Sequence, residues 1–289
     1  MTIKIMELPE PQNVLAAAAG TAVIPRIPQG FIYKAIVLVL GGTFVAADIS
    51  ELKLRLGGNV IWDTTGADLA TINAYNSLGA NASFLPMHFA DRTAKTPAGE
   101  RFGEIDTKNL TYSDFSLEVK LDGTQTGATL KAFAVIDTEN KPMTADGNST
   151  ASIVRSLVKA EHSRSAAGVF DLDIPVGSDQ GNIVRAVHFM DPSDVLTQYG
   201  LKKDSGDICD LLPVEWLEFV QDEVLRTSQA NHFCYDPQPD GIQANGIDTR
   251  RFNDAGQPVG RGAMRWRAGY SGSGVLTSYS DLYGTVATL

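Results

Sequence analysis

The sequence predicts an all-β protein made of two tandem β-sandwiches, each with a short α-helix in a connecting loop. The first observation is an internal repeat, because the second half of the 289-residue chain follows the feature order of the first half at a spacing of roughly 150 residues. The second observation is the alternation of apolar and polar residues in many short runs, which is typical of half-buried strands.

Five features occur in the same order in both halves. They are an apolar strand, an Ile-x-Asp pattern, an amphipathic helix, an aromatic-His cluster and closing strands. The matched segments are Ile32–Val37 with Ile183–His188, Ile61–Asp63 with Ile208–Asp210, Asp68–Tyr75 with Val214–Leu225, and Phe84–Phe89 with His232–Tyr235. A rival match of His88–Asp91 with His188–Asp191 does not fit this order.

In the first half, strand patterns alternate with turn-forming residues. Leu52–Leu56 alternates leucine with basic residues, and the turn Gly57–Asn59 leads into the next strand. Phe115–Leu121 and Leu130–Ile136 predict a hairpin joined by a loop of several residues, whereas 94–103 contains Pro97 and Gly99 and predicts a loop. The expected strands are 21–27, 32–40, 52–56, 60–62, 115–121 and 130–136.

The second half gives similar patterns. Expected strands are 169–175, 183–188, 208–210, 264–270 and 275–282, and the segment 152–158 fits either a helix or a strand. The stretch from Asp236 to Gly260 is rich in proline and glycine and predicts little regular structure.

Each predicted helix has a capping residue or a proline at its start. Thr64 or Thr65 caps the first helix, whose apolar face consists of Leu69, Ile72 and Tyr75. Pro213 occupies the first position of the second helix, where its missing N–H costs nothing. The apolar face of the second helix consists of Leu217, Val220 and Val224, with Trp216 beside it. Trp62, Trp216 and Trp266 all lie in patterned segments and are expected to be buried.

Turn-forming residues indicate the domain boundaries. We expect an N-terminal arm at 1–15, a first sandwich at 16–140, a linker at 141–165 and a second sandwich at 166–289. Pro9 and Pro11 interrupt regular structure in the arm, which should lie outside the sandwiches. Residues 138–150 consist mostly of turn formers.

Composition limits the possible functions. The net charge of −10 and the pI near 4.9 disfavour direct nucleic-acid binding, which needs a basic surface. Cys209 and Cys234 are too few for a disulfide or metal framework, and we expect buried free thiols, in agreement with assembly in a reducing cytoplasm. No segment reaches the roughly 18 apolar residues of a membrane span, and the N-terminus lacks the apolar core of a signal peptide.

The titratable residues point to no catalytic site, cofactor-binding site or metal site. His88, His162, His188 and His232 lack the spacing of metal ligands, and we expect imidazoles at strand ends that bond to backbone carbonyls. Paired catalytic bases among them are the alternative. Asp63 and Asp210 are expected to cap the helices that follow them.

The long second-half loop leaves calcium as an alternative to the absence of any cofactor. Asp236, Asp240, Asp248 and Asp254 share that loop, but their spacing fits a calcium loop poorly. A basic group, consisting of Arg250, Arg251, Arg261, Arg265 and Arg267, fits a subunit interface or a solvated strand better than nucleic acid. Nucleophile-elbow, phosphate-binding and dinucleotide-binding motifs do not occur.

Three stretches carry a resemblance to a known family. They are Ile32–Leu40 followed by Leu52–Gly58, then Phe84–Asp91 with Met87-His88-Phe89 at its centre, and the strand Phe115–Asp122. The chain resembles the major coat proteins of tailless internal-membrane bacteriophages, of the corticovirus type within the double jelly-roll lineage. The second half matches this family in layout more than in residues.

The resemblance implies two eight-stranded jelly rolls and a homotrimer of pseudo-hexagonal outline. Such trimers build an icosahedral shell over a lipid membrane, so the expected partners are further copies, minor capsid and penton proteins and the nearby membrane. The expected location is the virion, after synthesis in the host cytoplasm, and the family carries no catalytic residues. The alternatives are a tandem β-sandwich that binds carbohydrates or receptors, and a sandwich-fold glycosidase with two opposed carboxylates.

Overall fold

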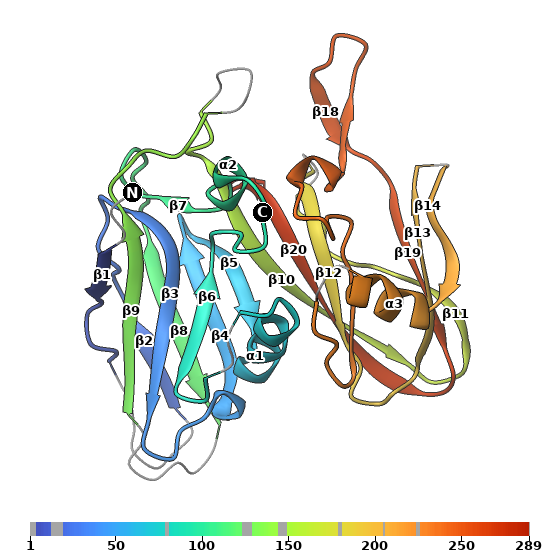
Figure 1. Cartoon of the computed structure of the whole chain (residues 1–289), viewed down its shortest axis with the longest axis horizontal. Coiled ribbons are helices and arrows are strands. Elements are labelled where there is room, and N and C mark those ends of the chain that lie inside the picture. The colour runs from blue at the N-terminus through green and yellow to red at the C-terminus, as the bar shows by residue number, and fades with distance from the viewer. Residues whose placement is uncertain are drawn as a thin grey trace. The chain divides into compact units, whose positions relative to one another are not determined.

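The chain forms two β-sandwich units in a computed structural model (Figure 1). The structure describes residues 4–12, 20–78, 81–122, 129–143, 149–178, 181–204, 206–223 and 226–288. The first unit comprises Met1–Leu157 and Thr285–Ala287, and the second comprises Val158–Gly284 and Thr288–Leu289. The predicted all-β class with two sandwiches is confirmed.

Two antiparallel sheets make up the first sandwich. Its strands are β1 (Lys4–Glu7), β2 (Gly20–Ile24), β3 (Ile32–Gly41), β4 (Ile49–Leu56), β5 (Asn59–Thr64), β6 (Phe84–His88), β7 (Ile105–Asp106), β8 (Phe115–Leu121) and β9 (Thr129–Asp137). One sheet has the order β1-β9-β3-β6, with β7 also paired to β3, and the other has the order β5-β4-β8-β2.

The second sandwich is built from later strands in the same way. These are β10 (Ile153–Arg164), β11 (Gly168–Leu172), β12 (Ile183–Met190), β13 (Leu196–Lys203), β14 (Gly206–Pro213), β15 (His232–Tyr235), β16 (Ile247–Asp248), β17 (Arg250–Phe252), β18 (Pro258–Arg261), β19 (Met264–Tyr270) and β20 (Gly274–Thr285). One sheet has the order β10-β20-β12-β15, with β16 also paired to β12, and the other has the order β11-β19-β13-β14.

The two strand orders are the same when the strands are matched in chain order. The last strand, β9 in the first sandwich and β20 in the second, lies between the first strand (β1 or β10) and the third strand (β3 or β12). In the other sheet, β8 lies between β2 and β4, and β19 lies between β11 and β13, which are the second and fourth strands of each sandwich. The chain changes sheet at most connections, which is the topology of a jelly roll. Both halves are therefore jelly rolls with one design, as the internal repeat predicted. We call β1–β9 the first roll and β10–β20 the second roll.

Leucine alternation fills the first core as predicted. Leu52, Leu54 and Leu56 of β4 are fully buried, while the residues between them are half-buried. Tyr33 of β3 and Phe115 of β8 contact each other across the sandwich, with ring centroids 5.0 Å apart. Burying such side chains, at about 1.5–3 kcal/mol each, is the main stabilising contribution.

The second core has the same character with more aromatic rings. Tyr235 of β15 packs edge-on against Trp266 of β19, with centroids 5.6 Å apart. Val184 and Leu276 from one sheet and Leu201 from the other are completely buried in the same cluster. Cys234 is buried and Cys209 half-buried, and both are free thiols.

Short helices lie in the connections. They are α1 (Gly66–Tyr75), α2 (Pro97–Glu100), α3 (Glu215–Glu223), and the 3-10 helices η1 (Ala46–Asp48) and η2 (Gln243–Asn245). Thr65 caps α1 by accepting the N–H of Asp68, so the choice of Thr64 or Thr65 is settled. Within the described residues, no helix is long and apolar enough to cross a membrane.

The N-terminal segment is a strand, which corrects one expectation. β1 pairs with β9 through four residues, from Lys4 opposite Ile136 to Glu7 opposite Phe133, and Leu8 is buried. Residues 4–8 therefore belong to the sandwich, and the expectation that the whole arm lies outside it is wrong. Residues 1–3 and 13–15 of the predicted arm lie outside the described residues.

β10 is the counterpart of β1 and occupies much of the expected linker at 141–165. The boundary between the two units falls within this strand, after Leu157. The pattern did not predict β1, and at 152–158 it left a choice between helix and strand that β10 decides in favour of a strand. Both strands lack strict alternation, because β1 is a short and mostly exposed edge strand and β10 is buried over several consecutive residues.

The predicted hairpin of Phe115–Leu121 with Leu130–Ile136 is wrong. β8 pairs with β2 and β4, whereas β9 pairs with β1 and β3 in the other sheet. Alternation identifies a strand and its buried face but not its partner, and in a jelly roll consecutive strands often lie in opposite sheets. β4 and β5 do pair directly, across a turn in which Gly57 and Gly58 have positive φ.

Two predicted loops contain regular structure. The 236–260 stretch holds η2, β16 and most of a β17–β18 hairpin that projects from the second unit (Figure 1). The Asn253 side chain accepts the N–H groups of Ala255 and Gln257 and so closes the hairpin turn. Within 94–103, Thr96 caps the single turn of α2.

Candidate functional site

The four histidines are all shielded from solvent to some extent, but they do not form one site. His162 Nε2 lies 2.9 Å from Ser278 Oγ, and His88 lies at the end of β6. His188 Nδ1 lies 3.1 Å from His232 Nε2, and the two rings stack at an angle of 24°. The partner of His162 is thus a hydroxyl, and His188 and His232 are partners of each other, whereas backbone carbonyls were expected.

Burial lowers the pKa of His88, His162 and His232 and so favours their neutral forms. It lowers the pKa of His232 to about 4, and burial together with Arg155 and Arg92 lowers that of His88 to about 4. A hydrogen bond between two imidazoles needs one ring nitrogen as donor and one as acceptor, which also requires a neutral ring. Because His188 and His232 are almost completely buried, a substrate has no access to them.

Asp63 and Asp210 are equivalent by position but cap no helix. Asp63 lies within β5, and Thr65 takes the capping role at α1. Asp210 lies exposed in β14, and α3 begins only at Glu215. The capping prediction is wrong because each strand continues beyond the aspartate. Pro213 likewise ends β14 instead of beginning the helix.

Three aspartates of the second-half loop bond to separate partners, and the fourth, Asp254, is exposed. Asp236 Oδ1 accepts the N–H of Gln238, and Asp240 Oδ1 accepts that of Ile242. Asp248 forms a two-pronged ion pair with Arg250 at 2.6 and 2.8 Å. Among the described residues, no group of three or more His, Cys, Asp or Glu side chains could hold a metal ion.

The basic group predicted near the C-terminus is divided between the β17–β18 hairpin, which carries Arg250, Arg251 and Arg261, and β19. Arg250 is paired with Asp248, Arg261 donates to the Gly177 carbonyl, and Arg267 lies 4.0 Å from Asp171. Arg251 and Arg265 are exposed on different strands. The five arginines therefore do not create one continuous basic surface of the kind that phosphate binding requires.

A buried cation at one strand position was missed in each half. Lys34 Nζ lies 2.8 Å from Glu104 Oε1 and 3.9 Å from Asp137 Oδ2, and all three side chains are buried. Arg101 Nε lies 3.1 Å from Glu104 Oε2 and so adds a second cation to this group. Burial raises the pKa of Glu104 despite these cations.

Next to this group, Lys141 joins three backbone segments. Its Nζ donates to the carbonyls of Phe102, Glu104 and Ile153 at 2.6–2.8 Å. Burial lowers the pKa of Lys141 to about 7. The lysine therefore fixes the start of β10 to the segment that precedes β7.

The second roll carries its buried cation at the matching place. Arg185 Nη1 lies 3.0 Å from Asp281 Oδ2, and both side chains are almost completely buried. Lys34 and Arg185 each occupy a bulge, where the pairing of β3 with β9 and of β12 with β20 shifts by one residue. The signal in the sequence was one basic residue inside an apolar run, at the same place in both copies.

The second roll exposes an aromatic ridge on α3. Trp216 and Phe219 are 52% and 55% exposed and pack edge-on, with centroids 5.7 Å apart, while Val220 is 40% exposed. The prediction that Trp216 is buried and that Val220 faces the core is therefore wrong, whereas Leu217 is buried as expected. Val224 lies outside the described residues. Trp62 and Trp266 are buried as predicted.

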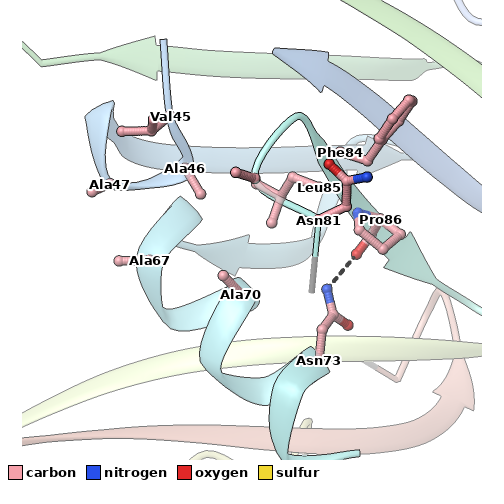
Figure 2. Close-up of a pocket in the computed structure, with 11 residues that line it drawn as sticks. Val45, Ala46, Ala47, Ala67, Ala70, Asn73, Asn81, Phe84, Leu85 and Pro86 are labelled. Carbon is pink, nitrogen blue, oxygen red and sulfur yellow. Dashed lines mark hydrogen bonds between the residues drawn. The ribbon is translucent and has the colours of Figure 1, made fainter. Parts of the chain in front are cut away.

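The first roll has a groove beside its own helix. A cavity of about 510 Å³ lies between η1, α1 and the start of β6, lined by uncharged residues of which five are alanines. Figure 2 shows Ala67, Ala70 and Asn73 on α1, Val45 to Ala47 at η1 and Phe84 to Pro86 at β6, with the Asn73 amide bonded to the Pro86 carbonyl. Such a lining suits apolar packing and offers no nucleophile or base.

Family comparison identifies this design. The model of the viral coat protein P2 N-terminal domain matches residues 5–137, and that of the C-terminal domain matches residues 154–286. The chain belongs to the viral coat protein P2 family. The two matched ranges correspond closely to the first roll and the second roll, and they include all but the first residue of β1 and of β10.

Solved structures share the fold of this coat protein. The major capsid protein P2 from bacteriophage PM2 aligns with a TM-score of 0.79 and 15% identity, covering 98% of each chain. The STIV major capsid protein aligns at 0.68 and 12% identity, covering 99% of this chain and 97% of that one. A PBCV-1 capsid chain aligns at 0.62 and 10% identity, covering 98% and 93%. No curated protein matches the chain in sequence.

Membership of the viral coat protein P2 family gives the chain a structural role in the virion capsid. A coat protein functions through the surfaces by which it associates with further copies of itself in the virion capsid.

Proposed function

We propose that the chain forms homotrimeric, pseudo-hexagonal capsomers, which build the icosahedral shell of a bacteriophage with an internal lipid membrane. The observation that carries this proposal is the duplication: both rolls have the same strand order, the same helix position and a buried cation at the same bulge. Three copies then present six similar sandwiches around one axis.

A closed ring also satisfies a physical need. Cyclic assembly joins one side of a subunit to the opposite side of the next, and it leaves no unused interface of that kind. β1 is an edge strand with Ile5 74% exposed, and such an edge invites pairing with other chains unless an assembly covers it. Trimer formation would cover exposed strand edges such as β1.

The proposed partners follow from this role. They are neighbouring capsomers, minor capsid and penton proteins at special positions of the shell, and the membrane beneath it. With a net charge of −10, the chain has no direct contact with nucleic acid. The proposal includes no enzymatic activity and no cofactor, and calcium between subunits remains the alternative to be tested with a chelator.

The alternative of a carbohydrate-binding or receptor-binding module needs exposed aromatic rings beside several hydrogen-bonding groups. Trp216 and Phe219 provide the rings, but among the described residues only Pro213 and Glu215 join them in lining the cavity beside them. A shell contact suits this apolar lining better than a sugar site does.

Light scattering combined with size-exclusion chromatography tests the trimer. The purified chain should elute at three times the chain mass of 31.0 kDa. Electron microscopy of assembled particles should then show pseudo-hexagonal capsomers around a lipid layer. A chain that stays monomeric at high concentration, or a shell that contains no lipid, contradicts the corresponding part of the proposal.

A further inference from the structure

The helices α1 and α3 are the same element of the two rolls, and their residues match one to one. Asn73 of α1 donates to the Pro86 carbonyl of β6, and Gln221 of α3 donates to the Cys234 carbonyl of β15. Each bond spans 13 residues. This match places Leu69 at Leu217, and both of these leucines are buried.

The same match shows where the two helices differ. Ile72 of α1 is 4% exposed, whereas Val220 at the matching position of α3 is 40% exposed. The outward positions Asp68 and Thr71 of α1 become Trp216 and Phe219 in α3. A polar outer face on one copy has thus become an aromatic one on the other.

The connection before the fourth strand also differs between the two rolls. In the first roll, residues 42–48 contain η1, which packs so closely on α1 that a Cβ on Gly66 would lie 2.2 Å from the Ala46 carbonyl oxygen. In the second roll, residues 191–195 form a tight turn, because Asp191 accepts the N–H groups of Val195 and Leu196 at 2.7 Å. This turn provides no counterpart of η1 beside α3, whose apolar ridge is exposed.

We infer that the α3 ridge of one chain inserts into the groove beside α1 of a second copy, across the contact between neighbouring trimers. The inference rests on the proposed function and adds the two surfaces that meet. The groove has the required chemistry, since its lining is uncharged and rich in alanine, with Val45 and Phe84 about half exposed at its edge. Small side chains on one surface leave room for the large rings of the other.

Charge selects this partner over two others. Glu215, Glu218 and Glu223 are exposed on α3, so two α3 ridges that face each other would bring like charges together. The same carboxylates oppose contact with an anionic membrane surface. The uncharged groove imposes neither penalty, which leaves a second copy of this chain as the occupant.

Symmetry places the contact between trimers. α1 and α3 lie on corresponding sides of their rolls, and a cyclic ring joins opposite sides, not corresponding ones. Corresponding sides meet across a twofold or near-twofold axis, which relates neighbouring capsomers. The contact is also small, because two half-exposed rings bury about 150–250 Å² together, against about 800 Å² per partner in a stable pair. It therefore acts through repetition over the shell.

The test uses the full chain with paired variants. Trp216→Ser with Phe219→Ser removes the ridge, and Ala47→Trp fills the groove from an exposed position. Val169→Ser with Val275→Ser is the matched control, because these residues are 44% and 42% exposed in the same roll. The ridge and groove variants should form trimers like the parent, but should need at least about tenfold more protein to form shells, whereas the control should not.

A disulfide tests the partnership directly. Ala47→Cys with Glu215→Cys keeps the aromatic rings, and oxidised shells should yield covalent dimers of chains that free trimers do not. Normal shells from the ridge variant, or loss of its trimers, would overturn the inference while leaving the coat role intact. A shift of the Trp216 fluorescence emission when anionic vesicles are added, without any shell, would overturn the inference and would make a membrane the occupant of the ridge. A parent chain that forms no trimer would instead overturn the proposed function, and this inference with it.

Discussion

The Arg185–Asp281 pair gives the sharpest test of how the second roll is held together. Both side chains are at most 2% exposed, and their charged atoms lie 3.0 Å apart. Asp281→Asn leaves a buried guanidinium that cannot release its proton. Removing one partner of a buried pair costs about 3–5 kcal/mol, and we expect the lower end because the amide oxygen of asparagine still accepts a hydrogen bond.

Urea unfolding measures this loss. With a slope of about 2 kcal/mol per molar urea, a loss of about 3 kcal/mol lowers the midpoint by about 1.5 M. Trp62→Phe, in the first unit, is introduced as a common background so that the fluorescence of Trp216 and Trp266 reports on the second unit alone.

The control is a pair of apolar residues of similar size. Arg185→Met with Asp281→Leu removes both charges and should unfold near the midpoint of the parent or above it, because a well-packed apolar pair often replaces a buried ion pair without loss. If Asp281→Asn leaves the midpoint unchanged, the pair is not buried as described. If the double variant loses as much as the single one, bulge geometry and not charge determines the stability.

Three further predictions concern single elements. Leu217→Ala should lower the unfolding free energy of the second unit by about 2–4 kcal/mol, whereas Val220→Ala should change that free energy by less than about 0.5 kcal/mol. Equal losses of the two variants in urea unfolding would contradict the exposure of Val220. Stability of the second unit should fall by up to about 3 kcal/mol between pH 6.5 and pH 4, because the folded-state pKa of His232 is about 4, so the unfolded chain takes up the proton first. His232→Leu should flatten that dependence, and an unchanged pH profile would refute it. Deleting residues 1–8 removes β1 and the buried Leu8, so thermal unfolding of the first unit should shift downward by several degrees; an unshifted transition would restore the view of an external arm.

The sequence by itself determined the class, the duplication and most of the strands. Alternation of leucine with charged residues in β4 required one buried and one solvated face, and the order of matched segments required two copies of one design. The three stretches that resemble coat proteins of membrane-containing phages led to the family that the two family models confirm.

Tertiary structure alone decided which strands pair and which surfaces stay exposed. β8 and β9 look like a hairpin because their patterns are adjacent, but a pattern defines a buried face and not a partner. Ile72 and Val220 occupy the same helix position, yet Ile72 is buried and Val220 is exposed, and η1 packs on α1 but has no counterpart on α3. Burial depends on segments distant in sequence, so the aromatic ridge that we assign to the shell contact could not be recognised from the helix pattern.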